Sequence, residues 1–446
     1  MTFDLVILGS GESGTGAALL AKQQGISVFV SDKGLILAKY KSELEQHQIS
    51  FEEGTHTEDI IFAAKEIIKS PGIPEKAEII QHLRQRMIPI ISEIEFAFRY
   101  KGESKILCIT GSNGKTTTTS LAYAMFQKDG YDVSVVGNIG HSFARQIAIQ
   151  PTAWYVMEIS SFQLDDIKTF RPDIAVITNI TPDHLDRYSY DFNLYTKAKF
   201  NIALYQTEND YLILCKDDKA TTHYLQNNPI KSQKLYFTMN EQLKDDGAYL
   251  NENELVINVN GEPFSISINE LSLKGKHNQY NSMAAGISAR VAEIRDTSIR
   301  ESLKSFTAIE HRMETIGNIR GIEFINDSKA TNLNSVWYAL ESMKKPTVLI
   351  LGGVDKGNDY SEITELVSTK VKAIVCLGID NSHIHKYFDG VVPIVDTTTI
   401  TDAVQEAYAL ASPGDCVLLS PACASFDLFK NYEDRGEQFK TSVKAL

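Results

Sequence analysis

The chain has 446 residues, enough for about three domains of ordinary size. Its composition, 43% hydrophobic and 23% charged, excludes collagen-like, low-complexity and largely disordered proteins, because those cannot bury enough apolar surface to fold. The formal net charge of −13 excludes general binding of nucleic acid or anionic membranes, so a phosphate site would depend on a few locally placed donors.

The start of the chain and its cysteines predict a cytoplasmic protein. The opening Met1-Thr2-Phe3-Asp4 lacks the basic region of a signal peptide, and no apolar stretch approaches the roughly 18 residues of a membrane helix. The cysteines are odd in number and scattered, and three lie in apolar runs, which favours buried free thiols in a reducing compartment. They are Cys108, Cys215, Cys376, Cys416 and Cys423.

The first region, residues 1–92, has the pattern strand, glycine-rich turn, helix, strand. An apolar run from Leu5 to Leu8 enters the turn from Gly9 to Gly16, and a later strand ends at Asp32. Glycines let the backbone approach a phosphate at a helix N-terminus, and the acid can accept a hydrogen bond from a ribose or base. The pattern predicts a Rossmann-like domain, with NAD or FAD binding as a second interpretation.

The second region, residues 93–307, opens with an apolar strand and a glycine-rich loop that starts at Thr110. Backbone N–H groups and the helix dipole can hold phosphates there, a lysine can neutralise them, and a threonine hydroxyl can ligate Mg²⁺. The loop is shorter than the usual Walker form, since Ile109 stands where its first glycine would be. We predict a nucleoside triphosphate site, rather than a chance glycine turn, formed by Gly111, Ser112, Asn113, Gly114, Lys115, Thr116 and Thr117.

Polar residues follow three further strands of this region, and such strand ends meet at one edge of a parallel sheet. Asn138 follows the first of these strands. Glu158 ends the second and could hold a metal ion or lie on the surface. His184 follows the third and could be a structural histidine or a ligand.

Other residues of this region also carry two interpretations. Lys197 and Lys199 lie about 200° apart on a predicted helix and cannot share a face. The default interpretation is that each is a solvated surface lysine. Asn278 and Asn281 could contact a base or simply cap a helix. Between them and the lysines, residues 209–270 predict a β elaboration, with a hairpin that turns at Asn260-Gly261.

The third region, residues 308–446, again alternates strands and helices, with polar clusters HRME, NDSKATN and SPACASF placed before or after strands. The chain is therefore expected to be an α/β protein of three domains, with boundaries near Ser92 and Thr307. We expect a Rossmann-like N-terminal domain, a central P-loop mononucleotide-binding domain with the β elaboration, and a C-terminal Rossmann-like α/β domain.

The order TGSNGKTT, GNIG, EISSFQL, TNITPDHLD, KGKHNQYN, EHRME, NDSKATN and SPACASFD resembles the Mur ligase family of peptidoglycan synthesis, over essentially the whole chain. The NDSKATN and SPACASFDLFKNYEDRG segments are most similar to the member that adds D-glutamate. The resemblance implies a monomeric ligase that uses ATP and two Mg²⁺ ions to join UDP-N-acetylmuramoyl-L-alanine to D-glutamate through an acyl phosphate. The alternatives are a related ligase for another amino acid and a non-catalytic nucleotide-binding scaffold.

The same resemblance implies domain roles: UDP-sugar binding for 1–92, ATP binding for 93–307 and amino-acid binding for 308–446. It implies catalytic roles for Lys115, His184 and Lys199, with Thr116 and Glu158 near one Mg²⁺ and His184 and carbamylated Lys199 at the other. Carbamylation needs a neutral amine, so the site must lower the pKa of Lys199.

The remaining implied contacts fall into three groups. Nucleotide contacts are Asn278, Asn281, Arg312, Asp327 and Lys329; UDP-substrate contacts are Ser13, Asp32, Gly72, Asn138 and His184; D-glutamate contacts are Thr331, Lys356, Ser425 and Phe426. Lys33-Gly34 stands where some relatives place Thr-Arg, which leaves the uracil and diphosphate contacts open.

Overall fold

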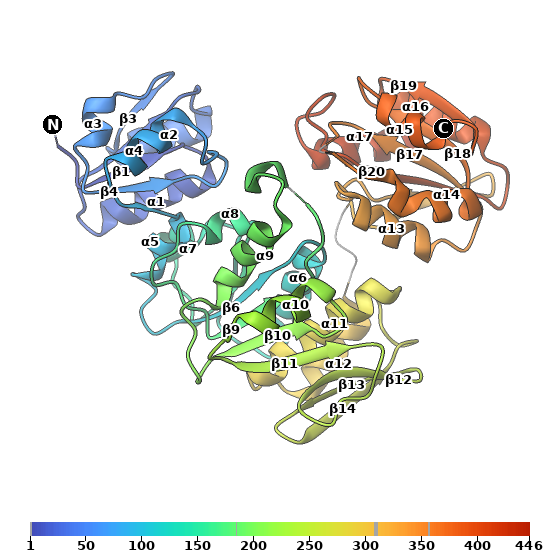
Figure 1. Ribbon diagram of the computed structural model, residues 1–446, viewed down its shortest axis with the longest axis horizontal. Helices are drawn as coiled ribbons and strands as arrows, with labels where there is room; N and C mark the ends of the chain where they lie inside the picture. The colour runs from blue at the N-terminus through green and yellow to red at the C-terminus, as the bar shows by residue number, and fades with distance from the viewer. Residues whose placement is uncertain (1, 184, 307–310, 356) are drawn as a thin grey trace. The chain divides into compact units, whose positions relative to one another are not determined.

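The computed structural model describes residues 2–183, 185–306, 311–355 and 357–446, with only the backbone of Asp186, Asn334 and Tyr338 (Figure 1). Within these residues the strands form three sheets flanked by helices, as the predicted three-domain α/β class requires. The chain divides into two compact units, Met1–Lys274 with Asn278–Phe306 and Gly275–His277 with Thr307–Leu446. The predicted boundary at Ser92 lies inside the first unit and the one at Thr307 falls outside the described residues, so both remain predictions.

The first sheet is parallel throughout, in the order β3-β2-β1-β4-β5. Apolar side chains fill both faces of β1, as expected of a strand that has helices on either side. Helix α1 lies close against the turn after β1 and requires glycine there: a Cβ on Gly14 of α1 would lie 1.9 Å from the carbonyl oxygen of Gly9. The elements are β1 (Leu5–Leu8), α1 (Glu12–Gln23), β2 (Val28–Asp32), α2 (Ala38–Gln46), β3 (Ser50–Glu53), α3 (Glu58–Phe62), β4 (Glu66–Lys69), α4 (Glu78–Gln85), β5 (Ile90–Ile91) and α5 (Glu93–Phe98).

The central sheet has nine strands in the order β14-β13-β12-β11-β10-β9-β6-β8-β7. Strands β6 to β12 pair in parallel, whereas β12, β13 and β14 pair antiparallel. The elaboration predicted for residues 209–270 is therefore confined to β12–β14, which extend the same sheet, because β10 and β11 belong to its parallel part. Leu255 pairs with Ile266 and Ile257 with Phe264 across the Asn260-Gly261 turn, which confirms the predicted hairpin. The strands are β6 (Lys105–Thr110), β7 (Val133–Gly137), β8 (Trp154–Glu158), β9 (Ile174–Ile177), β10 (Tyr211–Cys215), β11 (Gln233–Thr238), β12 (Gly247–Asn251), β13 (Glu254–Val259) and β14 (Glu262–Ser267).

Helices cover both faces of this sheet and supply much of its apolar core. They are α6 (Lys115–Lys128), α7 (Phe143–Ile149), α8 (Ser161–Leu164), η1 (Leu185–Tyr188), α9 (Phe192–Phe200), η2 (Asn201–Ala203), α10 (Lys219–Asn227), α11 (Lys276–Val291) and α12 (Asp296–Ser305).

The third sheet has the order β15-β16-β20-β17-β18-β19, in which only the β15–β16 pair is antiparallel. Apolar clusters lie on both of its faces. Its elements are β15 (Glu314–Ile319), β16 (Ile322–Asn326), α13 (Leu333–Ser342), β17 (Thr347–Gly352), η3 (Tyr360–Ile363), α14 (Thr364–Lys370), β18 (Val371–Leu377), α15 (Ser382–Phe388), β19 (Ile394–Thr397), α16 (Ile400–Leu410), β20 (Cys416–Ala422) and α17 (Tyr432–Lys444).

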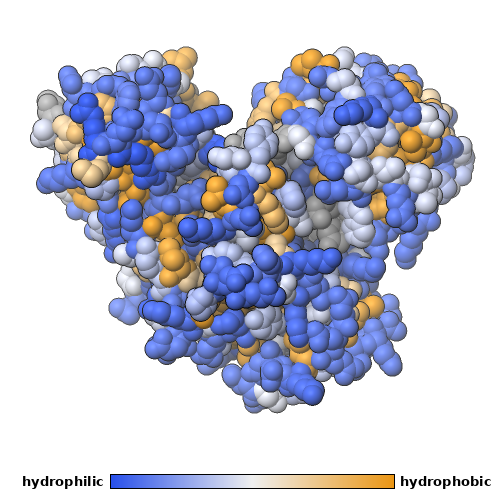
Figure 2. All heavy atoms as spheres, in the orientation of Figure 1, coloured by the Kyte–Doolittle hydropathy of each residue, from blue (hydrophilic) through white to orange (hydrophobic). Residues whose placement is uncertain are grey.

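All five cysteines are buried free thiols, as predicted. No helix among the described residues is long and apolar enough to cross a membrane. The face of the molecule in Figure 2 is largely hydrophilic, with apolar side chains scattered over it, in keeping with the charged composition.

Helix α1 of the first sheet packs on helix α7 of the central sheet. Gly16 permits this approach, since a Cβ there would lie 2.2 Å from Ser142 Oγ. The Arg145 guanidinium donates from α7 to Glu12, at 2.8 Å, and to both carboxylate oxygens of Glu43. Glu93 is 3% exposed and accepts a hydrogen bond from the backbone N–H of Ala144. A close glycine contact, an ion-pair cluster and a buried acid thus connect the first two sheets within one unit.

Burial of Glu93 makes this contact sensitive to pH. Burial raises the pKa of Glu93 from its usual 4.5 to about 8, against the lowering effect of the Ala144 N–H. The folded state therefore binds the proton more tightly than the unfolded state, and stability is lost as pH rises from about 4.5 to about 8. Glu93→Gln is expected to remove this loss, on the order of 5 kcal/mol, because each pKa unit corresponds to about 1.4 kcal/mol.

Urea unfolding at several pH values measures this effect. Trp154 lies in the first unit and Trp337 in the second. Glu93→Gln and the protein with Glu93 are therefore both studied with the additional substitution Trp337→Phe, so that tryptophan fluorescence reports the first unit. Glu58→Gln on α3, where the side chain is exposed, is the control. Parallel stability–pH curves for Glu93→Gln and wild type would contradict the expectation.

Candidate active site

The phosphate loop connects β6 to α6 and depends on two glycines in left-handed or related conformations. Gly111 has φ +147° and Gly114 has φ +83°. A Cβ on Gly111 would lie 1.9 Å from Thr178 Oγ1, and one on Gly114 would lie 2.3 Å from Asn281 Oδ1. The loop is therefore wrapped closely by neighbouring polar side chains, which leaves its backbone N–H groups in one defined arrangement at the N-terminus of α6.

Two residues that follow β9 hold the loop in place. The Thr178 hydroxyl donates to the carbonyl oxygen of Asn113 at 2.6 Å. The Asn179 side chain donates to the same carbonyl at 3.0 Å and accepts from the Asn113 backbone N–H at 3.0 Å. Sequence reasoning assigned neither residue a role, although β9 borders β6 and the TNITPDHLD segment follows it directly.

Lys115 and Lys199 both donate to one carbonyl oxygen. The Lys115 ammonium lies 2.9 Å from Gly111 O and 3.0 Å from Ser112 O, and Lys199 Nζ lies 2.9 Å from the same Gly111 O. Lys199 is 2% exposed, so its default interpretation as a surface lysine is wrong. Burial, reinforced by the nearby charge of Lys115, lowers the pKa of Lys199 well below its ordinary value. The site therefore favours the neutral amine that carbamylation requires.

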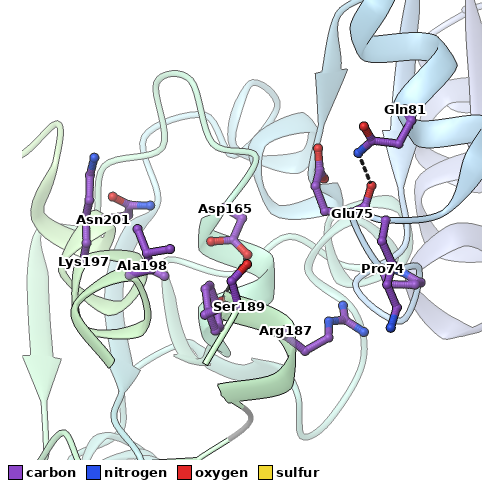
Figure 3. Close-up of a pocket in the computed structure, with 12 residues that line it drawn as sticks. Pro74, Glu75, Gln81, Asp165, Arg187, Ser189, Lys197, Ala198 and Asn201 are labelled. Carbon is purple, nitrogen blue, oxygen red and sulfur yellow. Dashed lines mark hydrogen bonds between the residues drawn. The ribbon is translucent and has the colours of Figure 1, made fainter. Parts of the chain in front are cut away.

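Lys197 lies on the same helix as Lys199 and faces elsewhere. Its side chain lines a cavity of about 500 Å³ (Figure 3). Segments that follow strands of the first sheet and of the central sheet form this cavity. Arg187 and Asp165 line the same cavity, and Gln81 donates there to the carbonyl oxygen of Glu75 at 2.7 Å. Among the described residues, none of the predicted site residues lines this cavity. Lys197 is exposed, which confirms its prediction as a surface residue.

Glu158 and the threonines of α6 provide oxygen ligands near the loop. Glu158 ends β8 beside Ile109 of β6 and is 5% exposed, so its interpretation as a surface acid is wrong. Its Oε2 has no hydrogen-bond partner among the described residues, and neither has the buried hydroxyl of Thr117. Thr116 is also buried. Unpartnered buried oxygens are costly unless a cation or ligand satisfies them, and hard oxygen donors suit Mg²⁺.

Asn278 and Asn281 lie inside α11, two and five residues after its start at Lys276, so their interpretation as helix caps is wrong. Asn281 accepts from the Thr118 hydroxyl at 3.3 Å and donates to Asn278 Oδ1 at 3.2 Å. The pair is therefore set against the phosphate loop and α6.

The predicted UDP-substrate residues of the first sheet gather at its carboxyl edge. Asp32 ends β2 and accepts from the backbone N–H and hydroxyl of Ser10, at 2.8 and 2.6 Å, and from Gly34 N at 2.9 Å. Ser13 is half-buried in α1. The carbonyl oxygen of Gly72 accepts from Arg187 at 3.4 Å, and the exposed Asn138 follows β7. Sequence reasoning missed Ser10, the partner of Asp32.

In the third sheet, Asp327 and Arg435 organise the two motifs that set this chain apart. Asp327 Oδ2 accepts from the Ser420 hydroxyl at 2.9 Å, and burial raises its pKa to about 7 against the lowering effect of Arg312. Arg435 is buried and donates to the carbonyl oxygens of Ser328, at 2.8 Å, and Cys423, at 3.3 Å. It thereby joins NDSKATN to SPACASFD. Sequence reasoning gave it no role, although it lies in the quoted SPACASFDLFKNYEDRG segment.

The other predicted residues of this unit differ in exposure. Ser425 is buried, Thr331 is half-buried and Phe426 is 73% exposed. Lys329 lies over the Tyr432 ring, 5.3 Å from its centroid. Two predicted site residues, His184 and Lys356, lie outside the described residues.

Family models match the chain over most of its length. The Mur ligase middle domain matches residues 109–289, the Mur ligase glutamate ligase domain matches 311–423, and the MurD N-terminal domain matches 5–79. The chain belongs to the Mur ligase family.

Curated relatives are similar over their full length. The UDP-N-acetylmuramoylalanine–D-glutamate ligase of Porphyromonas gingivalis W83 is 52% identical, with 100% of this chain and 99% of the relative covered. The enzyme of the same name from Bacteroides fragilis is 53% identical, with 99% of each covered. The fold is similar to that of MurC from Thermotoga maritima, with a TM-score of 0.62 at 18% identity and 99% of each chain covered.

Proposed function

We propose that this chain joins D-glutamate to UDP-N-acetylmuramoyl-L-alanine in an ATP-dependent reaction of peptidoglycan synthesis. The observation that carries the proposal is the shared carbonyl of Gly111, which holds a phosphate-loop lysine and a buried, easily neutralised lysine at one point. The full-length similarity to D-glutamate ligases supports the choice of amino acid. We place the reaction in the cytoplasm, where ATP is available, and expect a monomer.

The reaction proceeds through transfer of the γ-phosphoryl group of ATP to the substrate carboxylate, which gives an acyl phosphate and ADP. The amine of D-glutamate then attacks the acyl carbon, and the tetrahedral intermediate releases phosphate as the amide forms. Phosphoryl transfer depends on positioning and charge neutralisation more than on covalent help. In this proposal the N–H groups at the N-terminus of α6 bind the phosphates, while the Ser112 and Asn113 N–H groups donate to Asn179. Lys115 exchanges its carbonyl acceptors for phosphate oxygens.

Two Mg²⁺ ions, when bound, would neutralise phosphate and carboxylate oxygens. Thr116 and Glu158 would hold one of them, in keeping with the unpartnered buried oxygen of Glu158. His184 and carbamylated Lys199 would hold the other. Carbamylation joins CO₂ to the neutral Lys199 amine with loss of a proton, which converts a buried amine into an anionic oxygen ligand.

The proposed substrate contacts fall into three groups. The nucleotide is contacted by Asn278, Asn281, Arg312, Asp327 and Lys329. The UDP substrate is contacted by Ser13, Asp32, Gly72, Asn138 and His184, and D-glutamate by Thr331, Lys356, Ser425 and Phe426. Lys356 supplies a cation for the side-chain carboxylate that distinguishes glutamate from alanine.

Phosphate release tests the proposal. The full chain is incubated with ATP, Mg²⁺ and UDP-N-acetylmuramoyl-L-alanine, and released phosphate is measured for D-glutamate, L-glutamate, L-alanine and a diamino acid. Phosphate release is expected with D-glutamate and with none of the other three amino acids. Release with another amino acid instead would overturn the amino-acid assignment, and no release with any of them would overturn the ligase and favour a nucleotide-binding scaffold.

A further inference from the structure

A cysteine, a histidine and an aspartate meet at one edge of the third sheet, and none of them is among the residues assigned above. Cys376 lies near the end of β18 and Asp396 in β19, and the two are direct partners in the parallel register. His385 lies on α15, which follows β18. We propose that Cys376, His385 and Asp396 form a binding site for a thiophilic divalent metal ion of the Zn²⁺ class.

The ligand atoms already lie close enough to share one ion. Cys376 Sγ, a ring nitrogen of His385 and a carboxylate oxygen of Asp396 all lie within 4.8 Å of one another. His385 Nε2 lies 3.0 Å from Asp396 Oδ2. The other oxygen of Asp396 accepts from the Asn381 side chain at 2.9 Å, which fixes the orientation of the carboxylate.

The second nitrogen of His385 has the kind of partner that metal-bound histidines use. Nδ1 lies 2.8 Å from Asp389 Oδ1, one helical turn further along the chain. A carboxylate on one ring nitrogen fixes the tautomer, turns the other nitrogen toward the ion and makes it a better donor. This arrangement directs Nε2 toward Asp396 and Cys376.

The donor set selects the metal. A thiolate, an imidazole and one carboxylate suit Zn²⁺ or Co²⁺, whereas Mg²⁺ prefers oxygen ligands alone. Cys376 is buried and Asp396 is exposed, so an ion could enter from solvent, and water could fill the fourth position. Burial, together with the Asp396 carboxylate, raises the pKa of the Cys376 thiol. Binding therefore breaks the S–H bond, forms a metal–sulfur bond and releases one proton to solvent.

Such an ion would stabilise a turn that touches the predicted D-glutamate region. Beyond β18, Ile379 N donates to Asp427 Oδ2 at 3.3 Å, and Asp427 follows Phe426 directly. Thr397 Oγ1 donates to the carbonyl oxygen of Cys376 at 2.7 Å, which ties β19 to β18 at the site. The proposed metal site is inferred from these contacts alone and does not depend on the proposed ligase activity.

Cobalt absorption tests the proposal on the full chain. Co²⁺ bound to a thiolate gives an intense sulfur-to-metal charge-transfer band, whereas Co²⁺ in an oxygen-ligand Mg²⁺ site does not. The hydrogen bond with Asp389 raises the pKa of His385, so the titration is made at about pH 8, above the ordinary range of an imidazole. One equivalent of Co²⁺ is expected to produce this band, and Zn²⁺ is expected to abolish it. Cys376→Ser should lose the band. Cys416→Ser, another buried cysteine of the same sheet, should keep it.

His385 is half-buried, and Asp389 and Asp396 are exposed, so variants at these positions do not disturb the core. His385→Gln and Asp396→Asn are expected to weaken Zn²⁺ binding by at least 10-fold, and Asp389→Asn by about 10- to 100-fold, as measured by competition with a chromophoric chelator. Zn²⁺ should raise the thermal midpoint of the wild type but not that of His385→Gln. Absence of the band in the wild type, its survival in Cys376→Ser, or equal Zn²⁺ affinity in His385→Gln would each overturn the site. Any of these results would mean that His385 only forms ion pairs with Asp389 and Asp396.

Discussion

Lys199→Ala is expected to lower the rate of D-glutamate ligation by about 10³-fold or more, because it would remove both the proposed anionic metal ligand and a group held against the phosphate loop. The matched control is Lys197→Ala, two residues away on the same helix, whose side chain lines a separate cavity. That variant should keep near wild-type kcat and KM. Rates are measured by phosphate release with saturating ATP, UDP-N-acetylmuramoyl-L-alanine and D-glutamate.

Chemical rescue separates loss of the carbamate from loss of folding. A short carboxylate such as acetate or propionate should restore part of the activity of Lys199→Ala, since it can replace the carbamate oxygens in the cavity left by the side chain. A carbonyl carbon signal after incubation with ¹³C-bicarbonate should appear for the wild type and vanish for Lys199→Ala. Wild-type activity in Lys199→Ala would refute the carbamate role.

Lys115→Met is expected to lower kcat by about 10²- to 10³-fold, the usual cost of removing one placed charge from a phosphoryl-transfer site. ATP should bind more weakly, because the variant loses the cation beside the loop. Lys128→Ala, at the opposite end of α6, is the control and should change neither value. Equal kcat for Lys115→Met and wild type would contradict a direct role in phosphate neutralisation.

Lys115→Met also tests the electrostatic coupling between Lys115 and Lys199. Since the charge of Lys115 lowers the pKa of Lys199, its removal should raise that pKa and reduce the fraction of neutral amine. The ¹³C-carbamate signal of Lys115→Met should therefore weaken at a given pH and recover at higher pH. A signal unchanged across the pH range would show that burial alone controls Lys199.

Local patterns predicted the elements and the phosphate loop well, because β6, its glycines and the start of α6 are contiguous in the chain. They could not predict which lysine of α9 is buried, since periodicity places Lys197 and Lys199 on different faces without saying which face meets the protein. Only the resemblance singled out Lys199.

The residues missed by sequence reasoning act across long separations. Asn179 supports the loop at Asn113 from another strand, and Arg435 joins segments that begin about a hundred residues apart in the chain. Such contacts depend on strand order and helix packing, which no local spacing reveals. Cys376 and Asp396 are likewise neighbours only because β18 and β19 pair in register.

The burial of every cysteine gives the protein internal reporters of local opening. Cys108 lies in β6 and Cys215 in β10, whereas Cys376, Cys416 and Cys423 lie in or beside the third sheet. A thiol reagent can reach each sulfur only when the surrounding structure opens, so each labelling rate measures the opening free energy of one strand. Mass spectrometry of labelled peptides would thus show, thiol by thiol, which parts of the central and third sheets become more rigid when nucleotide or substrate binds.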